Sequence, residues 1–599
     1  MAESRFTYAR LSTRLRQSFR NDHLVLSVVA IAVGVVVGMC IVGFREAVDI
    51  FQGIFYGSNS FYGNESEHLG PIAAELPGWR IVIATTFGGL VVGILVSRLL
   101  PERRPQGVAE VIEANALFGG RMSSRTGLLV ALVNALSISA GASVGREGPA
   151  VHLGAVLSSW FGRRLHFSRS LTRTLLGCGV AAAVAASFNA PIAGALFATE
   201  VVIGHYALKA LAPVVIASVA GTAVSRAWFG NFPAFSMDVG FIVSLWEMPA
   251  FAILGVVSGV AAIVFMKTIG YAGQLSDMLP VPSWTKPAIA GFILGLVAMY
   301  FPEILGVGYA ATETAMLLGF SFWVLIGIGV FKILATGLCL GFGFGGGVFS
   351  PALVIGAMVG GAFGTIAAEV FPDMASAASV YTLVGMGAVA ASVLGAPIST
   401  TLIVFEMSSN YALTLAVMIA VVIASEITHH FYGRSFFSVQ LLNRGIDVKG
   451  GFEAEIMRSI PLNRVLKDDG LTVTPGTSLQ DLRTRLQNSP HGELFVVDKT
   501  GRLAGTITLA DLSDAAFDHG FDDIVNAGDV ARLHPPYLTL TDNLEQALNL
   551  MSETGEDHIA IVDNDKKMEY QGCIHQRDAM TAYSRALANV RHEERGETI

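Results

Sequence analysis

The stretch Gly145-Arg-Glu-Gly-Pro149 places two charged residues and a proline between long apolar segments. Charged side chains at membrane depth are costly and usually functional. Proline is tolerated in the first turn of a helix, so Pro149 predicts a helix that begins at this motif. Such a start directs backbone N–H groups and the positive end of the helix dipole at whatever precedes it. The stretch therefore predicts an anion site beside Glu147, although a buried structural ion pair between Arg146 and Glu147 would leave the same pattern.

The chain around this motif has the composition of a membrane protein. It has 599 residues, of which 52% are hydrophobic and only 14% are charged, whereas about 25% charged is usual in soluble proteins. About 20 apolar residues span a bilayer as a helix, and glycine and proline interrupt many of the apolar stretches. We therefore expect an all-α polytopic membrane domain over residues 24–440. The apolar stretches of membrane length include Leu24–Phe44, Ile81–Leu99, Leu175–Ile203 and Phe322–Leu340.

The membrane part repeats itself. Gly347-Val-Phe-Ser-Pro351 follows Gly145–Pro149 by 202 positions, with matching glycines after each proline. A second pair, Ala190-Pro191 with Glu200 and Ala396-Pro397 with Glu406, recurs at an offset of 206. Helix-packing glycines are common in membranes and could imitate one such match. The ordered series instead predicts two related halves, about 24–226 and 244–440, with a substrate site where they meet.

The two ends of the chain are polar. Residues 1–23 carry five arginines and predict a cytoplasmic basic arm. After a linker at 441–455 we expect two α/β modules, 456–518 and 527–584, and a flexible tail at 585–599. Each module has apolar strands, an intervening helix and a glycine six residues before an aspartate. The four cysteines form no CxxC pair, so neither a disulfide framework nor a metal site is predicted.

Three other classes of protein have partial support. Gly341, Gly343 and Gly346 match a dinucleotide-binding pattern, but without a soluble βαβ setting. Ser143 lies in a GxSxG pattern with His152 as the nearest base, which would suit an intramembrane serine hydrolase. A cation transporter would show acidic clusters along the membrane path, whereas the glutamates there are isolated: Glu147, Glu200, Glu406 and Glu426.

Residues 24–440 resemble the CLC family of chloride channels and chloride/proton exchangers. Gly145–Pro149 is similar to its GREGP motif and Gly347–Pro351 to its GxFxP motif. The resemblance implies a homodimer with one anion pathway per subunit and two inverted halves of broken, tilted helices. It implies that Glu147 is the gating glutamate, which competes with chloride and carries protons in exchangers. The implied anion-binding residues are Gln106, Gly107, Arg146, Gly148, Val348, Phe349 and Phe437.

Three positions depart from the family's pattern. Gln106 stands where the family has a serine, and its carboxamide can still donate N–H to an anion. Phe437 stands where the family has a tyrosine and lacks the hydroxyl donor. Val201 stands where exchangers often have an inner proton-transfer glutamate, and valine cannot carry a proton.

The tail resembles a pair of CBS domains. Thr508 and Asp511 match the pattern that binds a nucleotide ribose in that family, and Asp578 keeps the second aspartate, with His575 in place of the hydroxyl residue. An adenine nucleotide is therefore a possible ligand of the pair. A purely structural module that stabilises a dimer is the alternative.

These observations predict transport of chloride or a similar small monovalent anion, gated by Glu147, in a lipid bilayer. Proton-coupled exchange is the favoured mechanism, and a passive channel is the alternative because of Val201. We expect no enzymatic activity, no required cofactor and no nucleic-acid partner. The expected location is the inner membrane of the cell, with both termini cytoplasmic.

Overall fold

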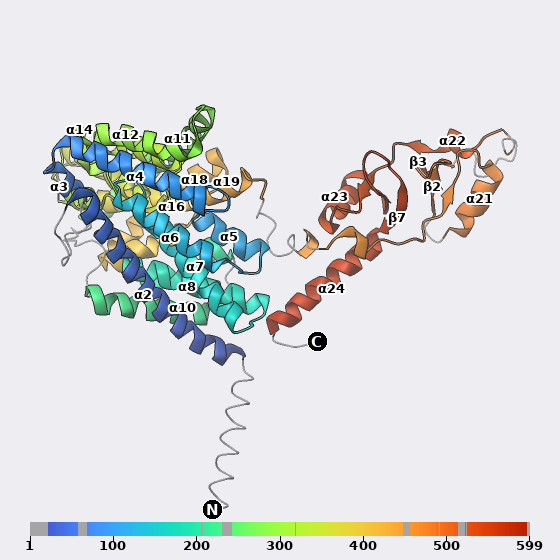
Figure 1. Cartoon of the computed structure of the whole chain (residues 1–599), viewed down its shortest axis with the longest axis horizontal. Helices are drawn as coiled ribbons and strands as arrows, with labels where there is room; N and C mark the ends of the chain where they lie inside the picture. The colour runs from blue at the N-terminus through green and yellow to red at the C-terminus, as the bar shows by residue number, and fades with distance from the viewer. Residues whose placement is uncertain are drawn as a thin grey trace, which may run out of the picture. The chain divides into compact units, whose positions relative to one another are not determined.

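The computed structural model describes residues 22–57, 69–204, 208–230, 242–317, 319–446, 456–458, 460–489, 492–512, 522 and 524–595. The chain forms two compact units, Met1–Val448 and Lys449–Ile599 (Figure 1). Most of the predicted basic arm (1–21) and of the predicted linker (447–455) lies outside the described residues.

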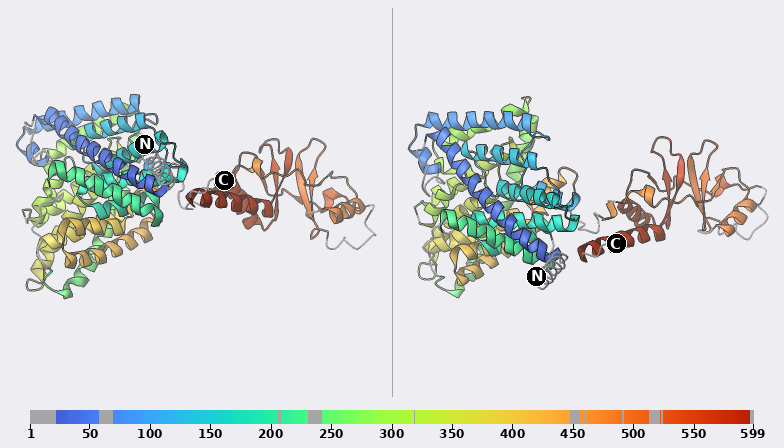
Figure 2. Two further views of the ribbon diagram at one scale, coloured as in Figure 1. Left: turned by 90° about the horizontal axis from the view of Figure 1, so that it is seen from below. Right: turned by 60° about the horizontal axis from the view of Figure 1, so that its bottom comes forward.

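The first unit consists of helices from two successive halves. The first half contains α2 (Asp22–Tyr56), α3 (Leu69–Ala74), α4 (Gly78–Leu99), α5 (Val108–Leu117), α6 (Ser124–Ser139), α7 (Glu147–Arg164), α8 (Arg169–Phe188), α9 (Pro191–Phe197), the π-helix η1 (Ala198–Ile203) and α10 (Leu208–Phe229). The second half contains α11 (Met248–Met278), α12 (Lys286–Ala298), α13 (Tyr309–Met316), α14 (Phe322–Gly341), α15 (Phe349–Val370), α16 (Ala378–Leu394), α17 (Pro397–Ser408), α18 (Tyr411–Tyr432) and α19 (Phe436–Leu442), with the short 3-10 turns η2 (Leu245–Glu247), η3 (Ser283–Thr285) and η4 (Pro302–Ile304). Figure 2 shows the long α2 running obliquely across this bundle.

The two halves pack in the same way. Helix α8 packs against both α7 and α10, and α16 packs against both α15 and α18. Glycine permits both central contacts, because a Cβ at Gly154 would strike the backbone of Gly179 and a Cβ at Gly356 would strike that of Gly385. Close approach through small residues is typical of membrane helices, where packing supplies much of the association energy. The predicted repeat is therefore present in the packing.

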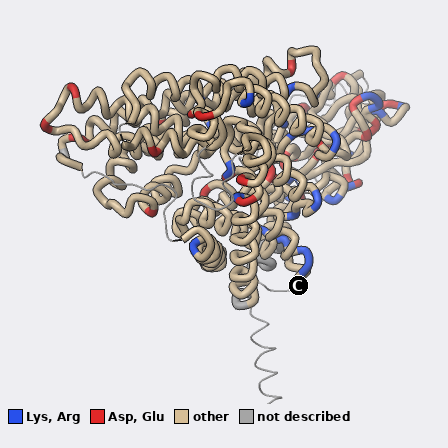
Figure 3. The backbone as a smooth tube through the Cα atoms, turned by 60° about the vertical axis from the view of Figure 1, so that its left-hand side comes forward, with Lys and Arg blue, Asp and Glu red and all other residues tan. Residues whose placement is uncertain are grey.

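The helical unit has the dimensions and surface of a membrane domain. Among the described residues, eight helical segments are long and apolar enough to cross a bilayer. Charged residues are sparse along this unit, which is mostly tan in Figure 3. Large apolar side chains such as Val28, Trp323 and Val422 are exposed, as expected for helices that face lipid. The eight segments are Val25–Tyr56, Gly78–Leu99, Arg169–Phe188, Ala210–Phe229, Met248–Met278, Phe322–Gly341, Phe349–Val370 and Tyr411–Leu442.

The second unit contains two small sheets with helices beside them. The first sheet has the order β1 (Thr472–Val473), β2 (Glu493–Val497), β3 (Leu503–Thr508), β4 (Arg532–Leu533), and the second has the order β5 (Tyr537–Thr539), β6 (His558–Val562), β7 (Tyr570–His575). Strand β2 pairs with β1 in parallel and with β3 antiparallel, and β6 pairs in the same way with β5 and β7. The helices are η5 (Leu462–Arg464), α21 (Leu479–Asn488), α22 (Ala527–Val530), α23 (Leu544–Thr554) and α24 (Gln576–Arg595).

The two predicted modules are not self-contained, because they exchange segments. Leu462 and Val465, from the start of the first module, are buried in the core of the second module with Leu544 and Ile559. In return, β4 of the second module pairs with β3 of the first. The structure also differs from the predicted flexible tail over residues 585–595, because α24 continues through Arg595, while residues 596–599 lie outside the described residues. The apolar residues of α24 recur at helical spacing, and Ala579, Ala582 and Tyr583 pack on the second core.

Candidate functional site

The two glycine-rich motifs meet at the centre of the helical unit. Gly145 and Gly347 form an antiparallel bridge in which each N–H donates to the other carbonyl at 2.7 Å. Directly after the bridge, α7 begins at Glu147 and α15 begins at Phe349. The first N–H groups of a helix have no partner within it. The bridge thus holds two helix N-termini, one from each half, next to each other.

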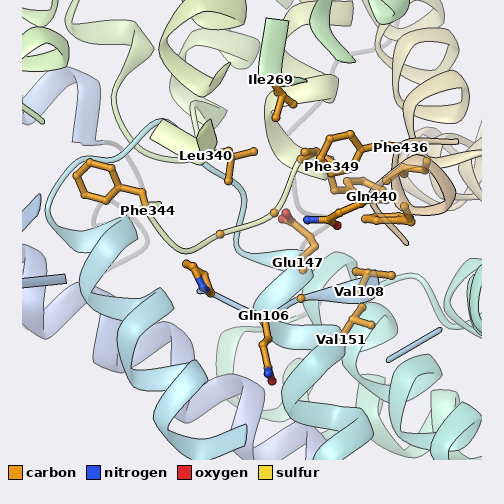
Figure 4. Close-up of a pocket in the computed structure, with 18 of the residues that line it drawn as sticks. Gln106, Val108, Glu147, Val151, Ile269, Leu340, Phe344, Phe349, Phe436 and Gln440 are labelled. Carbon is orange, nitrogen blue, oxygen red and sulfur yellow. The ribbon is translucent and has the colours of Figure 1, made fainter. Parts of the chain in front are cut away.

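A cavity of about 290 Å³ lies at these helix starts. Gly343 also lines it, at a backbone φ of +94°, where glycine is favoured. Glu147 is the single acidic side chain among the described residues that line the cavity (Figure 4). The predicted anion-binding residues on its wall are Gln106, Gly107, Gly148, Val348, Phe349 and Phe437.

The carboxylate of Glu147 is buried and held from three sides. The hydroxyl of Tyr309 donates to Oε1 at 2.6 Å, and the hydroxyl of Ser350 donates to Oε2. Arg146 Nε lies 3.8 Å from Oε1, and its guanidinium lies over the Tyr309 ring. Hydrogen bonds to a charged acceptor are stronger than those between neutral groups, so these contacts hold the carboxylate in place.

Tyr309 and Ser350 were not singled out from the sequence. Ser350 lies inside the Gly347–Pro351 motif, so the sequence predicts its position near the site. The sequence does not predict its hydrogen bond to Glu147. Tyr309 is the first residue of α13 and belongs to no recognised motif. Only the folded chain brings it to Glu147, which lies 162 residues earlier.

Two arginines line the cavity, one just before α5 and one just after α19. Arg104 and Arg444 both line it, and both pair with Glu110, at 2.9 and 2.7 Å. The other oxygen of Glu110 accepts the N–H of Gly107 at 2.6 Å. Gly107 therefore lines the cavity as predicted, but its N–H is engaged by a carboxylate in this conformation.

The aromatic and amide side chains on the wall are oriented differently from one another. Phe437 is buried and lies in the first turn of α19, beside Phe436 and near Gln440 in sequence, and all three line the cavity. In Figure 4 the carboxamide of Gln106 and the carboxylate of Glu147 point in opposite directions. The two side chains therefore lie on the same cavity without meeting.

The predicted anion-binding residue Arg146 lies away from the main cavity, and so does Val201, the position where exchangers often have a glutamate. Arg146 is not among the residues that line the main cavity. It borders a separate cavity of about 20 Å³ with Tyr309 and Asp49. Val201 lies in η1, packs against the core and is likewise absent from the main cavity wall.

The paired glutamates of the second repeat motif have a reciprocal structural role. Both oxygens of Glu200 accept N–H groups of Ile398 and Ser399 at the start of α17, at 3.0 and 2.8 Å. Both oxygens of Glu406 accept N–H groups of Ile192 and Ala193 at the start of α9, at the same two distances. A contact in which each partner caps the other is the mark of a two-fold relation. The halves are therefore related by a pseudo-two-fold axis between α9 and α17.

A buried lysine supports the segment before Tyr309. Lys332 of α14 is fully buried, and its Nζ donates to the carbonyls of Ile304 and Gly306 at 3.0 and 2.9 Å. It lies inside the apolar stretch Phe322–Leu340, and hydropathy averaged over such a stretch stays high despite a single lysine. Its contacts fix the backbone that leads into α13.

The alternative functions lose their structural support. The Ser143 hydroxyl bonds to Thr336 at 3.1 Å, and neither ring nitrogen of His152 has a hydrogen-bond partner among the residues that the structure describes, so Ser143 and His152 do not form a nucleophile–base pair. The glycines at 341, 343 and 346 follow a membrane helix and line the main cavity, with no strand before them, so the dinucleotide pattern is a coincidence.

In the second unit the Thr508–Asp511 pattern forms a local hydrogen-bonded turn. The N–H and the hydroxyl of Thr508 both donate to Asp511 Oδ2 at 2.7 Å, and Arg532 Nε donates to the same oxygen at 3.1 Å. Asp578 lies in the first turn of α24.

Comparisons with known proteins find relatives of both units. The family model described as "Voltage gated chloride channel" matches residues 88–429, and the CBS domain model matches residues 454–518 and 527–585. A curated relative, the voltage-gated ClC-type chloride channel ClcB of Escherichia coli, is 29% identical over 68% of this chain and 97% of its own length.

Two solved structures share the fold. A slow cyanobacterial Cl⁻/H⁺ antiporter aligns with a TM-score of 0.62 at 24% identity, over 70% of this chain and 97% of its own. A eukaryotic CLC transporter aligns with a TM-score of 0.62 at 20% identity, over 93% of this chain and 98% of its own.

Proposed function

Because this chain belongs to the voltage-gated chloride channel family, we propose that it moves chloride or a similar small monovalent anion across a membrane. The observation that carries the proposal is the convergence of the α7 and α15 N-termini, tied by the Gly145–Gly347 bridge, on a cavity shared with Glu147. Partial charges at helix ends attract an anion without trapping it as a bound cation would. The family consists of transport proteins, so the hydrolase hypothesis is dropped.

Glu147 is the proposed gate. Its carboxylate lies where the helix N-termini converge and competes with an anion for the same electrostatic field. A protonated Glu147 would lose its ion pair with Arg146 and one acceptor oxygen for the Tyr309 and Ser350 hydroxyls. It is then free to rotate away and admit the anion. Alternation of these two states couples a proton to anion exchange.

A passive channel is the second candidate. Val201 supports it, because an apolar side chain stands where exchangers often have an inner proton carrier, and it packs against the core. Within this mechanism Glu147 opens and closes the path without delivering its proton to the other side.

Flux into liposomes that contain the purified full chain distinguishes the two. An exchanger uses a chloride gradient to drive protons uphill, and a channel does not. Glu147→Gln mimics the protonated gate and should abolish proton movement while anion flux continues. The matched control is Glu426→Gln on α18, an exposed glutamate outside the cavity wall, which should retain coupling. Undiminished proton coupling in Glu147→Gln would contradict the assigned role.

Several further proposals follow from the family. Gln106 and Phe437 are proposed to tune anion selectivity, since both line the cavity. Two copies are proposed to form a homodimer in the inner membrane of the cell with cytoplasmic termini. The CBS pair is proposed to bind an adenine nucleotide through Thr508 and Asp511, supported by their shared turn, and through Asp578.

A further inference from the structure

Three potential metal ligands meet at the edge of the second sheet. Cys573 and His575 are separated by one residue on β7, so their side chains point to the same face of the strand. The backbone of Lys467 bridges Cys573, with both N–H groups donating at 3.0 Å. This bridge brings Asp469, two residues further along, to the same face.

The ligand atoms already have the spacing of a metal site. His575 Nε2 lies 2.9 Å from Asp469 Oδ1, and Cys573 Sγ lies 3.7 Å from that nitrogen and 3.8 Å from that oxygen. In a tetrahedral zinc site, bonds of about 2.0–2.3 Å place the ligand atoms about 3.3–3.6 Å apart. On that scale the contact between His575 and Asp469 must widen by about 0.4 Å, and the two contacts of the sulfur must shorten by about 0.1–0.2 Å.

The cluster is buried on one side and exposed on the other. Cys573 and His575 are buried, while the Asp469 side chain is 46% exposed. Gly470 follows Asp469 and has no side chain, and a Cβ there would lie 2.2 Å from the Tyr570 hydroxyl and 3.1 Å from Cys573 Sγ. His558 packs edge-on against the His575 ring and pairs with Glu493 at 3.1 Å.

We propose that Asp469, Cys573 and His575 bind a divalent transition-metal ion of the Zn²⁺ type, with water as the fourth ligand. A thiolate, an imidazole and one carboxylate select such ions over Mg²⁺ or Ca²⁺, which prefer oxygen ligands. On binding, the metal replaces the Cys573 thiol proton, which is released, and takes the His575 nitrogen from its contact with Asp469.

With this site, the second module would bind a metal ion at the position where the first module has the Thr508 hydroxyl. His575 stands where Thr508 stands in the first module, at the end of the strand that precedes the aspartate. An imidazole that binds a metal ion cannot donate to a ribose as a hydroxyl does. The proposal does not depend on the transport mechanism.

The simpler account is a His575–Asp469 hydrogen bond beside a buried thiol, with no metal. The two accounts differ in measurable binding. The purified full chain, stripped of metal with a chelator, is titrated with Co²⁺, and the thiolate-to-cobalt charge-transfer band is recorded. We expect saturation at one ion per chain and loss of the band when Zn²⁺ is added.

Variants locate the site. Cys573→Ser should remove the charge-transfer band, and His575→Gln should weaken cobalt binding at least about tenfold. Cys40→Ser, which changes the cysteine of α2, and Asp511→Asn in the first module should leave both unchanged. Absence of the band in the wild-type chain overturns the proposal whatever the variants do, and so does wild-type affinity in Cys573→Ser.

Discussion

Glu147 is the residue on which the transport proposal depends, and its neighbours explain how a carboxylate can lie buried in a membrane protein. Two hydroxyls and one guanidinium contact its two oxygens. A buried charge is tolerated when it is paired and hydrogen-bonded. Each of these contacts holds the carboxylate in place, so the loss of any one of them should make the gate easier to displace.

Tyr309→Phe tests the contribution of one contact with little change in shape. Removing one hydrogen bond to a charged group, worth about 1.5 kcal/mol, should make the Glu147 carboxylate easier to displace and raise anion flux by up to about tenfold. Ser350→Ala should raise the flux as well. The measurement is anion flux from liposomes at one fixed pH.

The control is Tyr381→Phe, which removes another buried tyrosine hydroxyl that bonds a glutamate, Glu247, away from the cavity. It should leave the anion flux unchanged. A wild-type flux in Tyr309→Phe would show that this hydroxyl does not hold the gate.

At the scale of elements, the N-termini of short broken helices are capped across the two halves. Glu200 and Glu406 each bind two N–H groups of the other half's helix. Carboxylates at helix N-termini are stabilising, because they satisfy orphan donors and oppose the helix dipole. Two equivalent carboxylate caps therefore stabilise the contact between α9 and α17.

Glu200→Gln and Glu406→Gln should therefore destabilise the helical unit by similar amounts. Each replaces charge-assisted bonds by weaker ones, at a cost of about 1–2 kcal/mol. Thermal unfolding of the purified chain in detergent measures the loss. Proton coupling should persist in both variants, because neither glutamate lines the cavity. A stability loss confined to one variant would contradict the two-fold relation.

At the scale of the whole molecule, the two parts of each unit depend on contacts with one another. In the helical unit the halves meet at the Gly145–Gly347 bridge and at the reciprocal caps of Glu200 and Glu406. In the tail, Leu462 fills the core of the second module while β4 completes the first sheet. Neither module of the tail is complete without the other.

Leu462→Ala tests this exchange. Loss of a fully buried leucine costs about 2–5 kcal/mol, and we expect the loss of amide hydrogen-exchange protection to fall on β6 and β7, far along the chain. Leu482→Ala, at an equally buried site in the first module's core, should reduce protection of β2 instead. Loss of protection in β2 with β6 and β7 unaffected in the Leu462 variant would contradict the exchange.

The sequence by itself predicted much of the architecture. The membrane class follows from apolar stretches, because hydrocarbon thickness sets helix length. The repeat follows from the spacing of glycine, proline and glutamate, and the family match and the solved structures confirm the predicted fold class. Glu147 was predicted to lie beside Val348 and Phe349, and the three do line one cavity.

The tertiary structure alone decided which groups meet across long separations. Tyr309 and Glu147, Glu406 and Ala193, and Asp469 and Cys573 lie 162, 213 and 104 residues apart. Periodicity and motif spacing report neighbours along one helix or strand, because they reflect local backbone geometry. Contacts between elements depend on how those elements pack, so the partners of the gate, the caps and the cluster in the tail became visible only in the folded chain.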